Sequence, residues 1–295
     1  MTATTDTTTT PTTEANSPMT TTPPTMTPST TSTSDRQSPP GRIRAVDVIR
    51  GEWIKFWSVR STSLTLLGAS LVTIVFGMIF SAVADSDEAA GPAALLTDPV
   101  EVALSGIGLS EMIIGVLGVL VVAGEYSTGL IRTSFAAVGR RSRVIGAKVV
   151  VVSVCTAVVM AVGVAGAVVL GQAVYAGTEE TVAFTDALDT IVGTTVYLTG
   201  IALIGVALGF LLRSTAAGIA TLVGAVFIGP NLLNLLPDSI TDVFLKYLPS
   251  EAGSAMMSRV SDPDLLSTGA GYAVFGAWVV GLLVAAGIYV ARTDA

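Results

Sequence analysis

Histidine is absent from the 295-residue sequence, and both cysteine and lysine are scarce. Without histidine the chain cannot form histidine metal sites, Ser-His-Asp triads or histidine proton relays. Its one cysteine, Cys155, allows neither an internal disulfide nor a Cys-x-x-Cys motif. The only lysines are Lys55, Lys148 and Lys246, and none follows a glycine, so the chain lacks a Walker A loop. We therefore expect no enzymatic activity, no metal and no cofactor in this chain.

Charge is also scarce. Only 13% of the residues are charged, whereas a typical soluble domain carries about 25%. Hydrophobic residues make up 51% of the chain, and the mean hydropathy is +0.73. Such a chain cannot cover a water-facing surface with charge, and a membrane is the natural alternative solvent.

The first 40 residues differ from the rest of the chain. Seventeen are Thr and seven are Pro, without aromatic residues or an apolar run. This composition cannot bury enough surface to offset the entropy of ordering, so it predicts a disordered segment. The tract fits either a glycosylated external stalk or a cytoplasmic tail, and the charge distribution described below favours the tail.

Six apolar runs follow within residues 41–295, which we interpret as one transmembrane domain. Each holds about 20 residues, enough for a helix to cross the ~30 Å hydrocarbon core. Alternating ten-residue segments, the pattern of a membrane barrel, are not visible. The sequence predicts an all-α integral membrane protein with six transmembrane helices; five or seven are the alternatives. The predicted spans are 62–84, 104–124, 150–172, 191–212, 216–236 and 271–290.

The basic residues predict the orientation of these spans. With the N-terminus inside, 13 of the 15 Lys and Arg residues fall in inner segments. The outer loops then hold only Lys246 and Arg259, against fourteen acidic residues. Positive charge accumulates on the cytoplasmic side of membrane proteins. We therefore expect a multi-pass protein of a bacterial plasma membrane with both termini in the cytoplasm.

An amphipathic stretch precedes the first span. At helical spacing an apolar face contains Trp53 and Trp57, while Lys55 and other charged residues face away. Two tryptophans beside basic residues, up to Arg60, suit a helix lying in the inner membrane interface. The alternative is a simple positive anchor for the first span. The predicted apolar face consists of Ile43, Val46, Ile49, Trp53, Phe56 and Trp57, and the charged residues facing away are Arg44, Asp47, Glu52 and Lys55.

The loop after the second span, residues 124–148, has an acidic start, a short amphipathic middle and a basic end. This pattern predicts a short helix at the cytoplasmic face that is available for docking to a partner. The alternative is a charged loop that only sets topology.

Residues 237–270, between spans five and six, contain apolar patches. These patches predict a short helical excursion in the outer leaflet; the alternative is an ordinary outer loop. These patches are Ile240, Val243, Phe244, Leu245, Tyr247 and Leu248.

One acidic residue, Glu111, lies inside the second apolar run. A carboxylate in a span is costly and is a default candidate for a translocation path. It can instead lie near the outer interface or be held protonated. Elsewhere in the predicted spans, the spacing of Gly205 and Gly209 permits close helix packing.

Two of these motifs resemble a known family. The stretch Glu52–Ser61, which reads EWIKFWSVRS, and the loop residues 124–148 are similar to the permease subunit of type-2 ABC exporters, in a branch common in actinobacteria. The resemblance covers about residues 45–292. Leu130 and Gly139 depart from the pattern, which more often has Thr and Pro at these positions. The loop residues that carry the resemblance are Gly124, Glu125, Tyr126, Gly129, Ile131, Arg132, Arg140, Arg141, Arg143, Ala147 and Lys148.

The resemblance implies a transporter mechanism. It implies that two six-helix subunits pair, either two copies or a copy and a paralogue, and that separate ATPase subunits carry ATP and Mg. The loop helix would pass the motion of the ATPase to the membrane. Glu125 would begin this coupling element by capping backbone N–H groups or by pairing with a basic group. The other coupling candidates implied are Tyr126, Gly129, Arg132, Arg140, Arg141 and Arg143.

Three functions compete at this point. The favoured one is a permease subunit of an ATP-driven exporter of a hydrophobic or amphipathic substrate, with membrane lipid but no nucleic acid as a partner. The second is a secondary transporter or channel, which normally shows several ionisable groups at midplane or matched broken helices. The third is an intramembrane enzyme or a non-transporting membrane scaffold.

Overall fold

The computed structural model describes residues 44–84, 98–175, 182–233, 235, 237, 244–259 and 265–293, and this part of the chain is helical, without strands. The predicted tail, Ile43, Ile240 and Val243 lie outside the described residues. The α-helices are α1 (Ala45–Ser58), α2 (Arg60–Ala84), α3 (Pro99–Leu104), α4 (Ile107–Ser127), α5 (Leu130–Val138), α6 (Arg141–Val174), α7 (Leu188–Leu212), α8 (Thr215–Val223), α9 (Gly229–Leu233), α11 (Pro249–Met257) and α12 (Thr268–Arg292).

Six of the described helical segments are long and apolar enough to cross a membrane, which confirms the predicted all-α fold with six spans. They are Arg60–Ala84, Pro99–Ser127, Arg141–Val174, Leu188–Leu212, Thr215–Leu233 and Thr268–Arg292. Long Val, Ala, Leu and Gly runs form helices here because a backbone in lipid must satisfy its own hydrogen bonds. The chain is thus a multi-pass integral membrane protein by length and composition of its helices.

The helix boundaries differ most from the predicted spans at α6. This helix has 34 residues and begins at Arg141, well before the predicted start of the third span. The second span is composite, because α3 precedes α4. Asp98 caps α3 by accepting hydrogen bonds from the backbone N–H groups of Val100 (2.8 Å) and Glu101 (3.3 Å), and Pro99 occupies its first turn.

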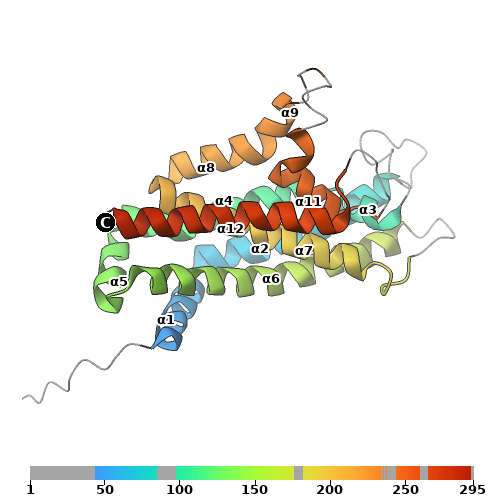
Figure 1. The fold of residues 1–295 in the computed structure, drawn as a ribbon. Helices are drawn as coiled ribbons and strands as arrows, with labels where there is room; N and C mark the ends of the chain where they lie inside the picture. Colours follow the sequence, from blue (N-terminus) through green and yellow to red (C-terminus); the bar gives the residue numbers. More distant parts are fainter. Residues whose placement is uncertain are drawn as a thin grey trace, which may run out of the picture. The chain divides into compact units, whose positions relative to one another are not determined.

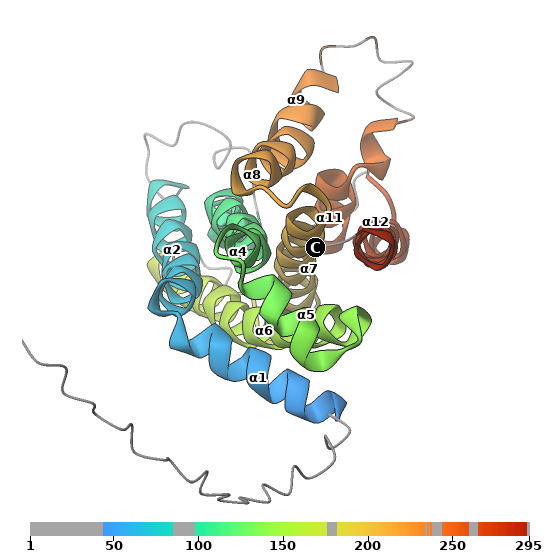
Figure 2. The same cartoon turned by 90° about the vertical axis from the view of Figure 1, so that its left-hand side faces the viewer.

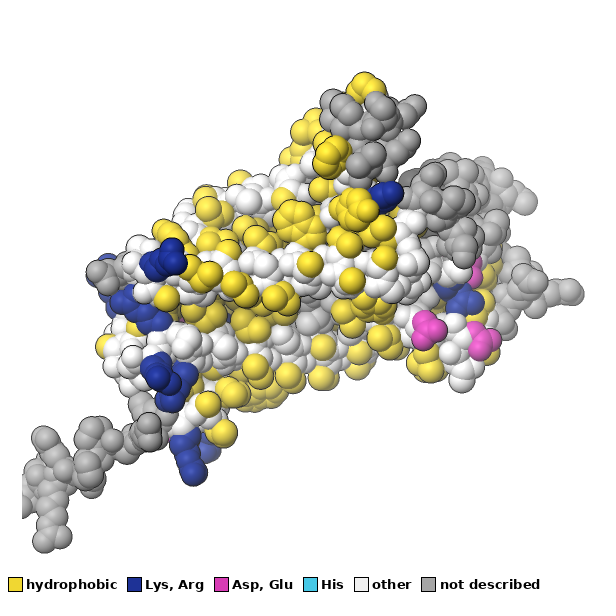
Figure 3. All heavy atoms as spheres, in the orientation of Figure 1, with side chains coloured by type: hydrophobic (Ala, Val, Ile, Leu, Met, Phe, Trp, Pro, Cys, Tyr) yellow, Lys and Arg dark blue, Asp and Glu magenta, His cyan; other side chains and the backbone are white. Residues whose placement is uncertain are grey.

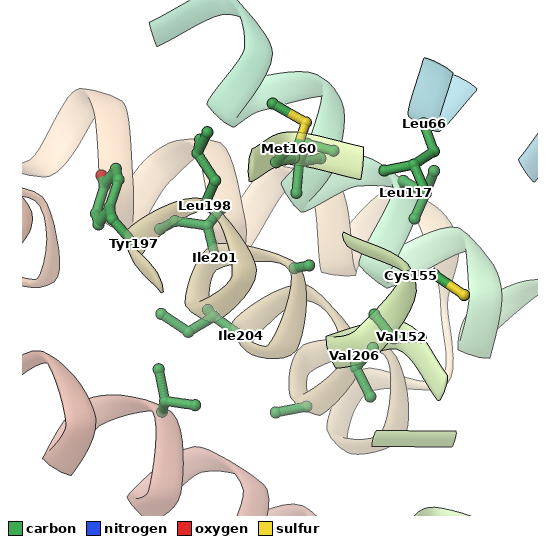
Figure 4. Close-up of a cluster of buried hydrophobic side chains, with 14 of the residues drawn as sticks. Leu66, Leu117, Val152, Cys155, Met160, Tyr197, Leu198, Ile201, Ile204 and Val206 are labelled. Atoms are coloured by element: carbon green, nitrogen blue, oxygen red, sulfur yellow. The ribbon is translucent and has the colours of Figure 1, made fainter. Parts of the chain in front are cut away.

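Helix α7 is the centre of the bundle and packs against α4, α6 and α12. Of its most apolar 18 residues 67% are buried, against 22% for the α8–α9 span and 22% for α12. Figure 4 shows part of the resulting core, in which Leu198 and Ile201 of α7 lie near Met160 of α6 and Leu117 of α4. The last two spans are therefore the ones whose surfaces are least covered by the rest of the bundle.

Small residues bring α4 and α7 close together. A Cβ on Gly205 would overlap the backbone carbonyl of Gly115, and one on Gly209 would lie 2.8 Å from the Cβ of Val122. The pair of glycines noted in the sequence therefore serves helix packing within this chain. The span formed by α8 and α9 is less regular, because a π-helical segment, Gly224–Ile228, joins the two helices.

The bundle has two chemically different ends. One end, called the basic end below, carries α1, α5 and the C-terminus of α12 (Figure 1). On the face shown in Figure 3, most Lys and Arg side chains gather there, and Asp and Glu gather at the other end. The opposite end carries α3 and α11 (Figure 1). An apolar surface separates the two ends, as expected of a protein that crosses a bilayer.

The segment between spans five and six is helical in much of its described part. A 3-10 turn, Leu245–Tyr247, leads into α11, which packs against α7 and α12. The described part of the predicted apolar patch thus forms a 3-10 turn, and α11 begins after the patch. A helical excursion of this segment into the outer leaflet stays a prediction.

Candidate functional site at the basic end

Helix α1 lies across the basic end, against α2 and α6 and next to α5 (Figure 2). Its buried residues are Val48, Glu52 and Phe56, which follow one another at intervals of four and so share one face. The prediction that Glu52 lies opposite the apolar face was wrong, because Glu52 shares the buried face with Phe56. Helix α1 packs against the bundle through this face, while Trp53 and Trp57 are 42% and 40% exposed.

Glu52 and Lys55 of α1 meet Glu125 of α4 and Lys148 of α6. These four residues are called the charge cluster below. The Nζ of Lys148 donates to Glu52 Oε2 at 2.6 Å and to Glu125 Oε1 at 2.6 Å. The Nζ of Lys55 lies 2.6 Å from Glu125 Oε1 and 3.7 Å from Glu52 Oε1. Two ammonium groups and two carboxylates thus form one neutral network that joins three helices.

Most of this network is buried. Lys148 is 2% exposed, Glu125 7% and Glu52 8%. A buried charge is tolerated only when it is paired and hydrogen-bonded, since its desolvation costs several kcal/mol per ion, to order of magnitude. The second carboxylate oxygen of Glu125, Oε2, is buried and has no hydrogen-bond partner among the described residues. The pairing of Glu125 with basic groups is one of the two roles expected for it from the sequence.

Helix α5, in the loop that follows Glu125, lies between two glycines with left-handed backbone conformation. Gly129 has φ 73° and precedes α5, and Gly139 has φ 68° and ends it. Glycine adopts this conformation without the steric cost that other residues incur. Proline, whose φ is fixed near −65°, cannot adopt it. Gly139 therefore gives α5 its own C-terminal cap, which a proline at this position could not do.

Helix α5 has the amphipathic character predicted from the sequence. Ile131 and Phe135 are buried, while Arg132 is exposed. Arg140 is exposed and lies between α5 and α6. The helix therefore turns its apolar side toward the bundle and its arginine toward the outside.

Two further arginines at this loop lie closer to the bundle. Arg141 donates to the carbonyl oxygens of Val290 (3.0 Å) and Thr293 (2.7 Å), and its guanidinium lies 5.8 Å from the ring centroid of Phe135. Arg143 is half-buried. The loop is thus attached to the end of α12 as well as to the charge cluster.

Tyr126, the next coupling candidate, points elsewhere. Its ring contacts Phe210 edge-on at 6.5 Å between centroids. The guanidinium of Arg213 lies 5.3 Å from the centroid of Tyr126 and 5.0 Å from that of Tyr289. Arg213 has φ 51°, a left-handed conformation that ends α7. This arginine therefore brings together the ends of α4, α7 and α12.

The predicted interfacial residues include an exposed pair of aromatic rings. The rings of Trp53 and Trp57 lie 6.2 Å apart, and Phe56 beside them is buried. Arg60 is exposed at the first residue of α2. This arrangement allows both tryptophans to contact lipid. The position of α1 at a membrane interface stays a prediction.

Glu111 lies far from these residues. Fourteen residues along α4 separate it from Glu125, which corresponds to about 21 Å of helix. It is buried, and the hydroxyl of Tyr197 donates to its Oε1. A Cβ on Gly253 of α11 would overlap the ring of Tyr197, so α11 closes over this pair. The translocation candidate and the coupling candidates therefore belong to two separate sites.

The end opposite the basic end has its own ionic contacts. Arg259, which follows α11, donates from Nε to Asp98 at 2.8 Å, and its backbone N–H donates to Glu101 at 2.8 Å. Its guanidinium also donates to the carbonyl of Asp186. These bonds hold together the segments before α3, before α7 and after α11, so we interpret them as structural.

Glu52 and Lys148 were not predicted as partners of Glu125. The predicted spans left Lys148 in the basic end of the loop before the third span. Only the early start of α6 at Arg141 puts this lysine inside an apolar helix, where it needs a counter-charge. Which acid supplies that charge depends on how α1 crosses the bundle, and no local sequence pattern contains this information.

No protein-family model matches the chain, and no curated protein is significantly similar to it.

Proposed function

We propose that this chain is the membrane-spanning permease subunit of an ATP-driven ABC transporter, working as an exporter in a bacterial plasma membrane. Its partners are a separate ATPase subunit, a second copy or a paralogue, and membrane lipid. The basic end faces the cytoplasm, so that both termini are inside. ATP and Mg bind on the ATPase, and the substrate is hydrophobic or amphipathic.

The observation that carries the proposal is the attachment of α5. Residues on both sides of this short helix are anchored: Glu125 before it to Lys148 and Lys55, and Arg141 after it to the end of α12. The left-handed Gly129 and Gly139 set α5 off from α4 and α6 as a separate element. A displacement of α5 would therefore reach α1, α6 and α12, which is what a coupling helix must do.

The exposed face of α5 is where the ATPase would bind. Arg132 and Ala136, one turn apart, are both exposed on the same face of α5. A cation beside a small apolar residue on an exposed helix face leaves this face accessible to a partner. The charge distribution supports this placement, because the Lys and Arg residues visible in Figure 3 lie mostly at the same end.

Ala136→Asp, compared with Ala291→Asp, tests the proposal. Both alanines are exposed and both lie toward the basic end, one on α5 and one on the last turn of α12. We expect Ala136→Asp to reduce co-purification of the ATPase subunit from native membranes and its substrate-stimulated ATP hydrolysis. Ala291→Asp should change neither. Equal behaviour of the two variants, or purification without any ATPase, would refute the proposal.

Glu125→Ala and single charge removals at Arg140, Arg141 and Arg143 extend this test from docking to coupling. These variants should still insert into the membrane but lose ATPase binding, transport, or both. If all of them retain both activities, the loop is only a topology signal.

A further inference from the structure

A cavity of about 370 Å³ lies beside the charge cluster, between α1, α2, α4 and α6. Its volume falls within the range of roughly 300–1,000 Å³ that is usual for small-molecule sites. The cavity is at the basic end, where α1 crosses the ends of α2 and α6 (Figure 2). Glu125 and Leu130 line this space, whereas Glu111 does not.

Part of the cavity wall is apolar. It consists of five side chains of α4 and α6 that lack hydrogen-bonding groups, so a polar ligand would gain nothing from this part. The same walls would hold a hydrocarbon chain. The wall residues are Leu117, Leu120, Val121, Val151 and Val152.

The most accessible charge at the mouth of the cavity is a cation. The side chain of Lys55 is 30% exposed, whereas those of Glu52, Glu125 and Lys148 are 10%, 9% and 2% exposed. The charge cluster is neutral as a whole, but the charge that a ligand meets first is therefore positive.

Hydroxyl groups accompany this cation. Ser61 and Thr62, in the first turn of α2, line the same cavity. The start of a helix also presents a positive dipole end, which favours an anion. Ammonium, hydroxyl and helix start together form a donor set for a phosphate group.

We propose that this cavity binds one membrane phospholipid. Its phosphodiester lies against Lys55 and the first turn of α2, and one acyl chain enters between α4 and α6. The proposal rests on the membrane character of the chain and does not depend on the proposed transport function. The exposed faces of Trp53 and Trp57 place the mouth next to the lipid headgroups if α1 lies at the interface, as predicted.

The amphipathic lining distinguishes this occupant from two simpler ones. Free phosphate would use the donors at the mouth and leave the apolar walls empty. An uncharged lipid would fill the walls and leave Lys55 without a new partner. A phospholipid satisfies both regions.

Native mass spectrometry of the delipidated full-length chain, titrated with dioleoyl phosphatidylglycerol, tests the proposal. We expect one tightly bound lipid per chain. Leu120→Trp, which fills the cavity from α4, should weaken this binding by about tenfold or more. The control is Leu71→Trp, because Leu71 is 61% exposed on α2 and does not line the cavity; it should bind as the unmodified chain does.

Lys55→Gln tests the headgroup contact. Loss of one charge-assisted contact should weaken binding by roughly tenfold. Arg50→Gln on the same helix is the control, since Arg50 is exposed and does not line the cavity. Inorganic phosphate should not compete with the lipid, and dioleoylglycerol should bind at least tenfold more weakly.

Each other outcome overturns a stated part of the proposal. Equal effects of Leu120→Trp and Leu71→Trp would mean that the lipid is not in this cavity. Equal binding of dioleoylglycerol, or an unchanged affinity in Lys55→Gln, would remove the phosphate contact. Competition by inorganic phosphate would indicate a simple anion site.

Discussion

Removal of the buried ammonium group of Lys148 is the most informative perturbation of the charge cluster. Lys148→Met keeps a long, unbranched side chain but leaves one cation, Lys55, for two carboxylates. Glu52 then loses its 2.6 Å contact and keeps only Lys55 at 3.7 Å. Glu125 keeps its 2.6 Å contact with Lys55. The substitution therefore leaves a nearly buried carboxylate, that of Glu52, with one weak partner.

The size of the effect follows from the burial of the cluster. Breaking a buried ion pair by removing one partner costs about 3–5 kcal/mol. At roughly 2–4 °C per kcal/mol for a chain of this size, Lys148→Met should lower Tm by roughly 6–20 °C. The double variant Lys148→Met with Glu52→Gln restores one cation and one anion. It should be more stable than the single variant, because Lys55 and Glu125 still pair.

Heating the detergent-solubilised chain and measuring the fraction that remains monodisperse gives the required Tm values. Arg50→Met is the control, since Arg50 is exposed on the same α1 helix and surface substitutions usually stay within about 0.5 kcal/mol. A loss of less than about 1 kcal/mol in Lys148→Met would refute the assigned role of the buried pair. A double variant no more stable than the single one would do the same.

Four other substitutions have expected outcomes in the same assay. Gly139→Ala should lower the free energy of unfolding by about 1 kcal/mol or more, because φ is 68° at this position. The control is Gly146→Ala in α6, where an added methyl group would meet no atom within 4 Å. This control should leave the stability unchanged or raise it by up to about 1 kcal/mol. Tyr197→Phe should cost about 1–3 kcal/mol, because it leaves the buried Glu111 carboxyl without its donor; an unchanged Tm would contradict this. Burial raises the pKa of Glu251 above its ordinary 4.5, so the stability that this carboxyl contributes should be highest below pH 4.5 and fall as the pH rises through the raised pKa. Glu251→Gln should remove that pH dependence.

Much of the fold could be predicted from the sequence, because the bilayer imposes a simple rule on it. Apolar runs of about 20 residues predict six spans, and the described part of the chain has six helices of that kind. The helical character of α1 and α5 was also readable from amphipathic patterns. Helix ends were predicted less well, as the early start of α6 at Arg141 illustrates. Hydropathy marks where a helix is apolar, and it does not mark where the helix begins.

The candidate site could be predicted only in part. Glu125 was identified from its place in a motif, but its partners come from a helix that precedes α4 and from one that follows it. The faces of α1 were predicted partly wrongly. The sequence pattern put Phe56 and Glu52 on opposite faces, and the structure buries both on one face, because Lys148 on α6 supplies a counter-charge for Glu52. For a helix lying between lipid and protein, both faces meet apolar surroundings, so amphipathicity alone does not select one.

The contacts around α5 also indicate how a signal could pass from it into the membrane. The charge cluster links Glu125, near the end of α4, to α1, and α1 runs into α2 with only Val59 between them. On the other side, Arg141 links the start of α6 to the last residues of α12. A displacement of α5 is therefore expected to reach the first and the last span through hydrogen bonds, and α7 only through packing. The first and last spans are also less enclosed than α7, with 33% and 22% of their apolar windows buried against 67%. They can move with less loss of packing, so under the proposed function we expect α2 and α12 to shift against α7 when an ATPase binds at α5.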